Sequence, residues 1–587
     1  MIPTDAPFVL FEDARPKGGK GRLFKAPVEE IRACALEDVE PALEAMRGAL
    51  RRGFHVAGWL SYEAGLALEP RLHKRARAAA LDGAPLLWFG VFKDVVMLDH
   101  GAVSSMLPDV NGAYISAPRP RVSSEEYANA YGRVHDYIVN GDVYQANLSY
   151  RADVFIEGEP LAAYAQMREA GQGGWSAIAR HGATWLLSTS PELFFRLSDG
   201  QIEARPMKGT APRHADPEKD RQAARALKAN PKERAENVMI VDLLRNDVSR
   251  LAKPGSVHVP ELFAVETYPT LHTLTSTVRA QLREECDAVD ALRALFPCGS
   301  ITGAPKLRAM EIISELEADA RGAYTGSIGW MAPDGSAEFN VAIRTVSILD
   351  GCAQLGLGSA IVFDSNLESE WAECRAKGAF ATANAPRFEL LETMRFEPAG
   401  GIAYLDLHLA RLGASAAVLD FAFDAERVRV ALTHALERAA QPHTLRLSLT
   451  KVGDVSVEVG PARKFGGDIV DVALVELPVS RHDFRLRHKT SHRAFYDDAR
   501  KAAGAEEVVF TDADGFVTEG SFTNVFLERG GMLLTPPLAR GLLPGVLRAS
   551  LIASGRAREA DLRVEDLREG FLIGNAARGL ARARIAR

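Results

Sequence analysis

A single lysine in the segment RPMKGTAPR, residues 205–213, stands where a side chain could act as a nucleophile. Pro206 restricts the backbone before Lys208 and Gly209 frees it afterwards, so the segment can hold the amine in a pocket. A lysine attacks only as the neutral amine, and burial lowers its pKa toward neutrality. The apolar run TWLLSTS leads into Glu192, and we expect a raised carboxyl pKa there, suited to proton transfer. For each residue taken alone, a solvated charge is the default interpretation.

Two predicted helices, 233–248 and 368–383, each carry two glutamates on one face: Glu233 with Glu236, and Glu370 with Glu373. Residues three apart on a helix share a face, and like charges there repel slightly. Either pair alone is consistent with a solvated face. Together the pairs could form an oxygen-rich site for Mg²⁺, which keeps several waters and needs few protein carboxylates.

The segment FPCGSITGAPKLRAMEII, residues 296–313, is rich in glycine and leads into a helix predicted to begin around Pro305. The first backbone N–H groups of such a helix are free to bind a carboxylate or a phosphate. With Lys306 and a strand-borne Arg344, this site would favour a substrate with more than one carboxylate. The alternative is an ordinary glycine-rich turn before a helix.

The composition sets the class of protein. A chain of 587 residues that is 47% hydrophobic and 25% charged is globular, with two or more cores. Its net charge of -7 and its dispersed Lys and Arg argue against nucleic acid as a partner. No apolar run is long enough for a membrane span and no secretion signal opens the chain, which predicts a cytoplasmic protein without membrane association. The five cysteines form no CxxC pair, so neither disulfides nor a zinc site are indicated.

The elements that must position these residues divide into two modules. Up to residue 385, helices and mostly hairpin-linked strands predict a large α+β layered fold. The last helix of this part runs out near Pro386, where we place a boundary. Strands and helices then alternate through 386–587, a length sufficient for an independent core. Predicted strands are 184–190, 324–332, 341–349, 467–476, 507–511 and 522–528, and further predicted helices are 218–229, 405–419, 425–439 and 545–554.

Several motifs follow one another between residues 120 and 385: GDVYQANLS, SPE, RPMKGT, RAENVMIVDLLRND, VETYPTLHTLTSTV, FPCGSITGAPK, IRT and DSNLESEWAE. Jointly they resemble the chorismate-utilising enzymes. Within that family, anthranilate synthases carry a small residue at the position of Lys208, whereas aminodeoxychorismate synthase component I carries lysine, as here. The resemblance implies that Lys208 attacks C2 of chorismate while Glu192 protonates the departing C4 hydroxyl. Ammonia then adds at C4 and expels the lysine.

The same resemblance implies a metal site and a substrate pocket in a catalytic core spanning 121–385. Glu236 and Glu373 would hold Mg²⁺, with Glu233 and Glu370 acting through water, and the ion would anchor the ring carboxylate. The positions that correspond to the pocket are His272, Thr302, Gly303, Lys306, Tyr324 and Arg344.

Three features qualify this resemblance. Ser359 and Ala360 replace glycines of the family in GLGSAIVFDS, which alters close approach to the substrate carboxylate. Residues 1–120 match weakly, and in relatives this part packs beside the core and can form a tryptophan pocket. No GxCxG turn with a downstream His and Glu is present, so ammonia comes from a glutamine amidotransferase subunit or from solution.

The second module carries its own candidate lysine. Lys489 lies beside Thr490 among positive charges, which favour the neutral amine. Glu519 is predicted at a strand edge, and LLPGVLRASLI predicts a helix start suited to a phosphate. A lysine for the aldehyde, an acid for the pyridine nitrogen and a phosphate cup are the needs of pyridoxal phosphate. Singly, each of these features is also ordinary structure.

Across 386–587 the segments LETMR, LHLARL, HKTSHR, TEGSFTN, LLPGV and IGNAARGL resemble the fold-type IV pyridoxal phosphate enzymes. The resemblance implies that Lys489 forms the Schiff base and Glu519 pairs with the ring nitrogen. Arg411, with backbone groups near Ser521 and Val546, would bind the phosphate. Leu547 stands where many relatives have threonine, which predicts a weaker phosphate site.

The motifs of this module do not separate aminotransferases from aminodeoxychorismate lyase, but the fusion does. A lyase that removes pyruvate from the product of the first module would yield 4-aminobenzoate. Lys489 would abstract the C4 proton, and Thr393 resembles a hydroxyl near the leaving enol in lyases. The alternatives are an anthranilate synthase-like module fused to an aminotransferase, and a non-catalytic scaffold. Relatives of this module usually pair, which predicts a possible homodimer.

Overall fold

The computed structural model describes residues 2–75, 84–269 and 271–586. The chain forms two compact units. The first contains the described residues up to Leu107 together with 117–156 and 164–384, and the second contains 108–116, 157–163 and 385–587. Two short segments from the N-terminal half therefore belong to the unit that the C-terminal half builds.

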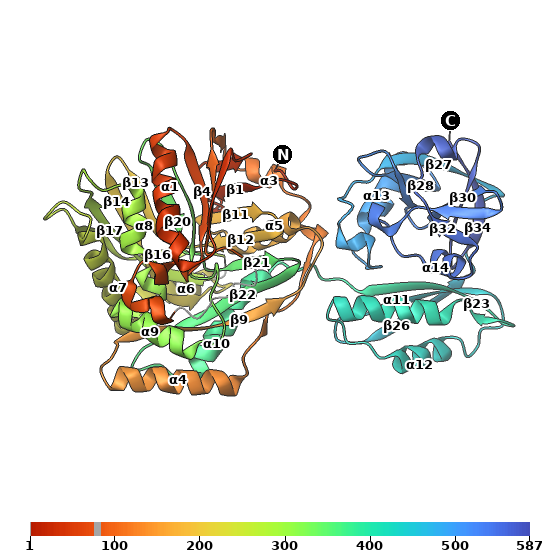
Figure 1. Ribbon diagram of the computed structural model, residues 1–587. Coiled ribbons are helices and arrows are strands. Elements are labelled where there is room, and N and C mark those ends of the chain that lie inside the picture. Colours follow the sequence, from red (N-terminus) through yellow and green to blue (C-terminus); the bar gives the residue numbers. More distant parts are fainter. Residues whose placement is uncertain (1, 76–83, 270, 587) are drawn as a thin grey trace. The chain divides into compact units, whose positions relative to one another are not determined.

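Among the described residues, the first unit contains two ten-stranded antiparallel sheets (Figure 1). One sheet runs in the order β18 (Gly303–Ala304), β9 (Gln145–Val154), β22 (Cys352–Ile361), β21 (Thr345–Leu349), β12 (Thr184–Ser190), β11 (Trp175–His181), β1 (Phe8–Glu12), β2 (Gly21–Lys25) and β6 (Val96–Leu98), with β8 (Arg119–Pro120) beside β9. The other runs β15 (Met207–Pro212), β17 (Leu271–Gln281), β14 (Gln201–Arg205), β13 (Leu193–Ser198), β20 (Ala337–Asn340), β19 (Ser327–Met331), β4 (His55–Leu60), β5 (Leu87–Phe92) and β3 (Glu29–Ala33), with β16 (His258–Thr267) beside β17. Strands from the first 120 residues are present in both sheets, so this range is not a separate layer.

The two sheets face each other across an apolar core. Trp175 comes from the first sheet, and Trp59, Trp88 and Trp330 come from the second. The rings of Trp59 and Trp88 are 4.8 Å apart between centroids. Alternate residues of a strand point to the same face, which is why both sheets can direct large side chains into one layer.

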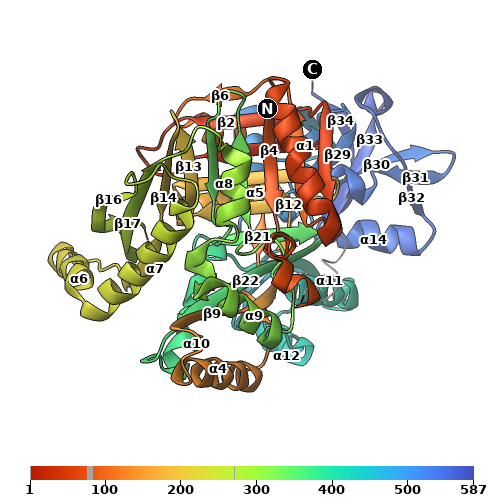
Figure 2. The same cartoon turned by 60° about the vertical axis from the view of Figure 1, so that its left-hand side comes forward.

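Helices cover the outer faces of the sheets. The helices of this unit are α1 (Val39–Arg51), α2 (Ala64–Ala67), α3 (Ala102–Met106), α4 (Ser124–Val139), α6 (Pro217–Ala229), α7 (Pro231–Ser249), α8 (Ala288–Leu295), α9 (Lys306–Leu316) and α10 (Leu367–Gly378), and α5 (Pro160–Gly171) begins in a segment of the other unit. Core residues of α1, α7, α8 and α9 pack against the second sheet. Figure 2 shows α6 and α7 at the end of that sheet which carries β14, β16 and β17. Among the described residues, no helix is long and apolar enough to cross a membrane.

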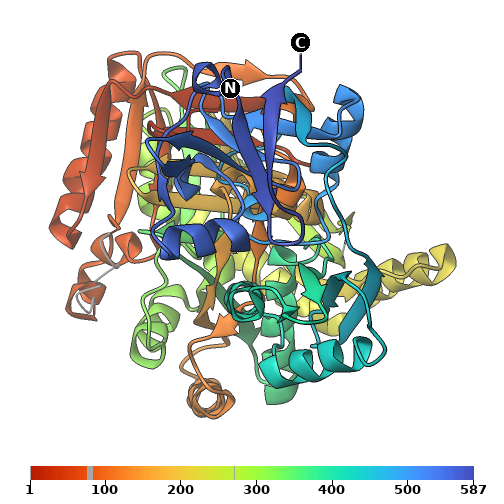
Figure 3. The ribbon, with the colours of Figure 1, turned by 90° about the vertical axis from the view of Figure 1, so that its right-hand side faces the viewer.

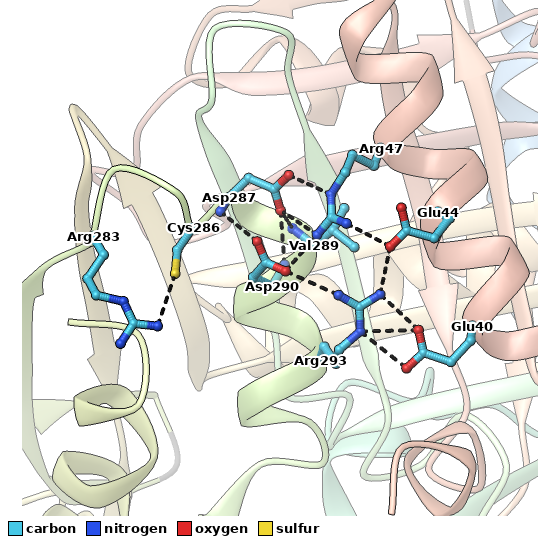
Figure 4. Close-up of polar contacts among 9 residues, drawn as sticks. All are labelled: Glu40, Glu44, Arg47, Arg283, Cys286, Asp287, Val289, Asp290 and Arg293. Atoms are coloured by element: carbon cyan, nitrogen blue, oxygen red, sulfur yellow. Dashed lines mark hydrogen bonds and ion pairs between the residues drawn. The ribbon is translucent and has the colours of Figure 1, made fainter.

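Ion pairs join α1 to α8 (Figure 4). Arg47 on α1 binds Asp287 at 2.7 Å and Asp290 at 2.6 Å. In the other direction, Arg293 on α8 binds Glu40 at 2.8 Å. An exposed ion pair by itself contributes little to stability. A network in which several pairs share charges holds the two helices in place better than isolated pairs do. The network fixes the helix that leads directly into the glycine-rich segment 296–303.

Among the described residues, the second unit contains two larger sheets, one four-stranded and one eight-stranded, with their own helices (Figure 3). The four-stranded sheet runs β24 (Gly401–Ile402), β23 (Leu390–Glu397), β25 (His443–Leu449) and β26 (Val455–Pro461), and α11 (Leu405–Val418) and α12 (Ala425–Ala435) pack on it. The eight-stranded sheet runs β29 (Val517–Gly520), β28 (Glu507–Thr511), β27 (Ile469–Glu476), β34 (Gly579–Ile585), β33 (Phe571–Asn575), β30 (Asn524–Arg529), β31 (Met532–Thr535) and β32 (Ala557–Glu559), beside α13 (Ala494–Ala503) and α14 (Val546–Ala553). β27 pairs in parallel with both β28 and β34, so this sheet is mixed.

Most elements lie where the sequence pattern predicts them. The helices predicted at 218–229, 233–248, 405–419 and 545–554 correspond to α6, α7, α11 and α14. The strands predicted to begin at 324 and 341 begin later because Thr325 and Arg344 have positive φ, 59° and 48°. Such residues cannot continue a strand. The prediction that Arg344 lies within a strand is therefore wrong, since it directly precedes β21.

Candidate active sites

Lys208 lies on the strand β15. It faces Leu274 in the pairing of β15 with β17, and the register shifts between Lys208 and Thr210. Gly209, at φ 79°, forms this irregularity. A Cβ on Gly209 would lie 2.5 Å from Oε2 of Glu233, so only glycine fits there without a shift of that side chain. The bulge therefore brings the lysine strand close to the acidic end of α7.

The environment of Lys208 contains charges of both signs. The residue is half-buried. Burial lowers the pKa of Lys208, and the charge of Lys377 adds to this lowering. The charge of Glu236 acts in the opposite direction and raises the pKa. Glu192 and Glu373 act in the same direction as Glu236 and favour the ammonium. The lysine is thus a partly desolvated amine whose charge is retained by neighbouring carboxylates.

Glu192 lies between β12 and β13 and is 3% exposed. Burial raises its pKa to about 7, although Ser300 and the charge of Lys208 oppose the rise. Among the described residues, Oε1 of Glu192 has no hydrogen-bond partner. The expectation of a raised pKa is confirmed, and the group can donate a proton near neutral pH.

The first glutamate pair lies on α7. Burial raises the pKa of both Glu233 and Glu236. Glu233 raises the pKa of Glu236 further, and Glu373 and Glu370 from α10 raise that of Glu233. The acidic faces of the two helices therefore lie within electrostatic range of each other, as their spacing in sequence suggested.

The second pair, on α10, already has partners. Glu370 is buried and accepts a hydrogen bond from Ser365 at 2.7 Å. Lys377 binds Glu373 at 2.7 Å. Although burial acts in the opposite direction, Lys377 and Lys208 lower the pKa of Glu373. Among the described residues, no group of three or more His, Cys, Asp or Glu is placed to hold a metal ion. Any cation here would bind to one or two carboxylates and to water, which is common for Mg²⁺.

Sequence reasoning missed Lys377. Its ammonium bonds to the carbonyl of Gly358 on β22 at 3.0 Å in addition to Glu373. It also acts electrostatically on both Lys208 and Glu192. The available signal was the spacing of four residues from Glu373, which places the two side chains together on one helix face.

Thr302 and Gly303 form the tight connection before α9. The hydroxyl of Thr302 donates to the carbonyls of Cys298 and Gly299, each at 3.2 Å. A Cβ on Gly303 would lie 2.2 Å from the carbonyl oxygen of Gln145. Both residues therefore shape the backbone of this segment.

Lys306 and His272 have protein partners in the structure. The ammonium of Lys306 binds Asp247 at 3.2 Å and the carbonyl of Leu295 at 2.6 Å, which ties α9 to α7 and to the end of α8. The two ring nitrogens of His272 bond with Thr267 and with Asp220, each at 2.9 Å. A role for either residue in substrate binding stays a prediction. To bind substrate, either side chain would have to exchange one of these protein contacts for a contact with the substrate.

Arg344 and Tyr324 differ from these two. Arg344 forms no ion pair with any described residue, and burial lowers the pKa of its guanidinium. An unpaired, desolvated guanidinium is suited to a carboxylate. Tyr324 is 9% exposed, and a Cβ on Gly356 of β22 would lie 2.1 Å from its ring. The glycine thus allows close packing of the tyrosine on the sheet.

The two replacements of family glycines point to opposite faces of β22. Ser359 is fully buried, and its hydroxyl lies 3.4 Å from the hydroxyl of Tyr127. Ala360, the next residue, is partly exposed. Because neighbouring residues of a strand face opposite sides, only one of the two substitutions can alter any one face.

A cavity of about 640 Å³ lies in the second unit. All six residues to which the sequence analysis gave a role in cofactor binding or catalysis in this module line it: Thr393, Arg411, Lys489, Glu519, Ser521 and Val546. The structure therefore brings together candidates from β23, α11, β29 and α14. The size is within the range of sites for small ligands and cofactors.

Lys489 is held beside β23. Its ammonium donates to the hydroxyl of Thr393 at 3.0 Å, and its carbonyl accepts from the N–H of Leu391 at 2.8 Å. Burial lowers the pKa of Lys489 to about 7, and Arg411 acts in the same direction. A large fraction of this amine is therefore neutral at physiological pH.

Glu519 is 3% exposed on β29. Burial raises its pKa to about 7, against hydrogen bonds from Tyr496 and from the N–H of Leu543. Those donors lie at 2.5 Å and 3.1 Å. A buried carboxyl group that is poised between its two forms is suited to share a proton with a ring nitrogen.

Arg411 is oriented by a glutamate that sequence reasoning missed. Its guanidinium binds Glu392 at 2.6 Å and the carbonyl of Pro544 at 3.1 Å. Although burial acts in the opposite direction, Arg411 and His408 lower the pKa of Glu392 to about 2. Pro544 lies just before Gly545, which caps α14. Arg411 is therefore fixed beside a helix N-terminus, an arrangement that favours a phosphate.

Val546 begins α14, as predicted, and Leu547 beside it is buried. Ser521 has partners within the protein, and phosphate binding by backbone groups near it stays a prediction. Its N–H and its hydroxyl both donate to Glu507, at 2.8 Å and 2.5 Å. Both donors are therefore used within the protein, and Ser521 contributes to the cavity wall.

Two protein families match this chain, one in each half. Residues 6–383 match the family of chorismate binding enzymes. The chain belongs to this family. Residues 389–585 match class IV amino-transferases. Both resemblances that the motifs indicated are confirmed.

Individual relatives of this chorismate binding enzyme cover parts of it. Aminodeoxychorismate synthase component 1 of Klebsiella aerogenes is 40% identical over 365 residues, which are 59% of this chain and 79% of that protein. The protein of the same name from Escherichia coli K12 is 45% identical over 252 residues, 43% of this chain and 56% of its own length. In structure, anthranilate synthase component I from Streptococcus pneumoniae TIGR4 is similar with a TM-score of 0.55 at 25% identity, covering 62% of this chain and 92% of that one.

Proposed function

We propose that this chain makes 4-aminobenzoate in two steps. The first unit converts chorismate and ammonia to 4-amino-4-deoxychorismate, and the second unit removes pyruvate from that product. The observation that carries the proposal is a half-buried lysine in each unit, Lys208 and Lys489, whose pKa burial lowers. The relatives named aminodeoxychorismate synthase component 1 support the first step, and the class IV match supports the second.

In the first step, the neutral amine of Lys208 attacks C2 of the chorismate ring. The ring electrons shift, the bond between C4 and its oxygen breaks, and Glu192 protonates the oxygen so that it leaves as water. Ammonia then adds at C4, and the bond between C2 and the lysine nitrogen breaks. The pKa of about 7 at Glu192 suits this role, because a substantial fraction of the group is protonated near neutral pH.

Mg²⁺ would neutralise the acidic faces of α7 and α10 and bind the ring carboxylate. Glu233 and Glu236 fit such an ion, because burial and the charges of nearby glutamates raise their pKa values even though Lys208 and Lys232 oppose the rise, and a cation would stabilise the charged carboxylates. Glu236 and Glu373 are the proposed direct ligands, and Glu233 and Glu370 the proposed ligands through water. The unpaired Arg344 is the proposed partner of a substrate carboxylate.

In the second step, pyridoxal phosphate would supply an electron sink for the carbanion that forms at C4. The cavity fits this cofactor, because its lining includes a lysine for the aldehyde, Lys489, a buried acid for the ring nitrogen, Glu519, and a cation for the phosphate, Arg411. The neutral amine of Lys489 removes the C4 proton. Thr393 accepts a hydrogen bond from that amine, which supports a role for its hydroxyl in passing a proton to the departing enol oxygen.

The proposed partners follow from the chemistry. Chorismate and ammonia are the substrates, and the relatives' designation as component 1 supports a separate glutamine amidotransferase as the source of ammonia. A homodimer through the second unit and a cytoplasmic location remain predictions from the sequence.

Purified protein supplied with chorismate, ammonium, Mg²⁺ and pyridoxal phosphate tests the proposal. We expect 4-aminobenzoate and pyruvate in equal amounts. Anthranilate, which is identified by its fluorescence, would instead support the alternative first reaction. Lys208→Ala separates covalent from direct amination, since undiminished amination at C4 in this variant would contradict attack by the lysine.

A further inference from the structure

The second unit contains two segments that its family match does not include. The match covers residues 389–585, yet residues 108–116 and 157–163 belong to the same compact unit. We call them the inserted segments. Their contacts concentrate on the chain that leads to Lys489.

Tyr114 is the central residue of the first inserted segment. It is 3% exposed and belongs to the apolar core of the four-stranded sheet. Its ring lies 6.2 Å from that of Phe388 and 6.4 Å from that of Phe484, between centroids. Its hydroxyl donates to the carbonyl of Leu419 at 2.8 Å and accepts from Lys451 at 2.6 Å.

Each of these contacts lies on an element that carries a site residue. Phe388 directly precedes β23, which carries Thr393. Leu419 ends α11, which carries Arg411. Phe484 begins the short 3₁₀ turn that leads to Lys489. One side chain from the N-terminal half thus contacts all three elements whose relative placement defines the lysine site.

Charged residues of the inserted segments hold the same turn from another side. Asp109 binds Arg485 at 2.7 Å, and Arg485 also binds Asp483 at 2.6 Å. Glu157 binds Arg487 at 2.9 Å. Because Arg485 is 7% exposed, its position depends on both of its carboxylate partners. These ion pairs fix residues 483–487, which immediately precede the lysine.

The lysine has little freedom to adjust if this turn moves. Its neighbour His488 bonds to Ser415 of α11 at 3.0 Å, and its own amine bonds to the hydroxyl of Thr393 at 3.0 Å. We propose that the inserted segments position Lys489 through Tyr114 and Asp109, so that the cofactor site of the second unit requires residues of the N-terminal half. The inference goes beyond the proposed function, because binding of pyridoxal phosphate by Lys489 can be measured whether or not pyruvate is eliminated.

Three substitutions in the full chain test this proposal: Tyr114→Phe, Tyr114→Leu and Asp109→Asn. Tyr114→Phe removes only the hydroxyl, so it keeps the apolar core. The readouts are the dissociation constant of pyridoxal phosphate, the pH midpoint of the absorbance of the bound cofactor, and kcat and KM of pyruvate release. Amination of chorismate by the first unit is the internal control.

Outer contacts that orient a binding residue typically change affinity or rate by about 10-fold, and we expect at least that for Tyr114→Leu. Tyr114→Phe and Asp109→Asn should each change the dissociation constant by about 3-fold and shift the pH midpoint. We expect kcat of pyruvate release to fall, KM to stay nearly constant and amination to be unchanged. Asp109→Glu should restore the parent values, and Glu437→Gln, at an exposed site of the same unit, should change none of them.

A lower melting temperature in these variants with unchanged cofactor affinity, pH midpoint and kcat would overturn the proposal, since the segments would then only stabilise the unit. A parent chain that binds the cofactor but releases no pyruvate would contradict the proposed second reaction and leave the binding measurements as the test of Tyr114. Lys489→Ala, measured in parallel, should lose binding of pyridoxal phosphate. Its result gives the largest effect that a substitution at Tyr114 or Asp109 could reach.

Discussion

The two candidate lysines are half-buried, and burial lowers the pKa of each, but the balance of charge among their neighbours differs. At Lys208 three carboxylates, Glu236, Glu192 and Glu373, favour the ammonium, and Lys377 opposes them. At Lys489 three arginines, Arg411, Arg493 and Arg446, favour the neutral amine, and Glu392 opposes them.

The difference teaches that burial alone does not prepare a lysine for chemistry. Burial brings the pKa of Lys489 to about 7, and the charges of Arg411, Arg493 and Arg446 add to this lowering. The field at Lys208 opposes deprotonation until positive charge compensates the glutamates. A dication between α7 and α10 would therefore activate the first lysine as well as bind substrate, whereas the second lysine needs no such help.

The largest expected effect is a clean separation of the two reactions. Lys208→Ala should lower amination of chorismate at least about a thousandfold, and Lys489→Ala should do the same to pyruvate release, because each removes the group that forms or breaks bonds. Each variant should leave the other reaction intact. The assay is separate turnover of chorismate and of purified 4-amino-4-deoxychorismate. Loss of both reactions in either variant would contradict two independent sites.

Glu192→Gln should lower amination by about 100-fold or more, the usual contribution of a general acid. The pKa of Glu192 is about 7, so the acid form is lost as the pH rises through 7 and the parent rate should fall above that pH. The residual rate of the variant should lack this decline. Glu338→Gln, on the ion pair with Arg196, is the control that should retain the parent profile.

Mg²⁺ should distinguish the two amines directly. Labelling with an acylating reagent at pH 8, read by mass spectrometry of the two lysine peptides, should become about 3- to 10-fold faster at Lys208 when Mg²⁺ is added, because nearby positive charge favours the neutral amine. Labelling at Lys489 should not change. Equal responses at both lysines would remove the electrostatic distinction between the sites.

The smallest expected effect is on stability. The pKa of Lys489 in the folded chain, about 7, lies below its ordinary value of 10.5. The unfolded state therefore binds a proton that the folded state lacks at pH 8, and stability is lost as the pH falls from above 10.5 to 7. Lys489→Met should raise the melting temperature of the cofactor-free chain at pH 8 by about 2–4 °C, with a smaller gain at pH 10.5. The exposed Lys501→Met should show no gain at either pH.

Local sequence patterns predicted much of the fold. The spacing of apolar residues located α6, α7, α11 and α14, and the spacing of glutamates placed both acidic pairs on single helix faces. These are properties of residues within one or two turns, so they can be read without tertiary structure. The strand starts near Thr325 and Arg344 were misplaced, because nothing in the sequence signalled a positive φ at a threonine or an arginine.

The sequence by itself determined which residues could do chemistry, namely two lysines and two acids. It also determined the two sets of motifs that indicate the families. Tertiary structure decided which charges surround each lysine, and so assigned roles to Lys377 and Glu392 that no local pattern had revealed. It also brought Tyr114 into the core that supports Lys489. The reason is physical, since the pKa of a group depends on charges and solvent within a few ångströms, and those neighbours come from distant parts of the chain.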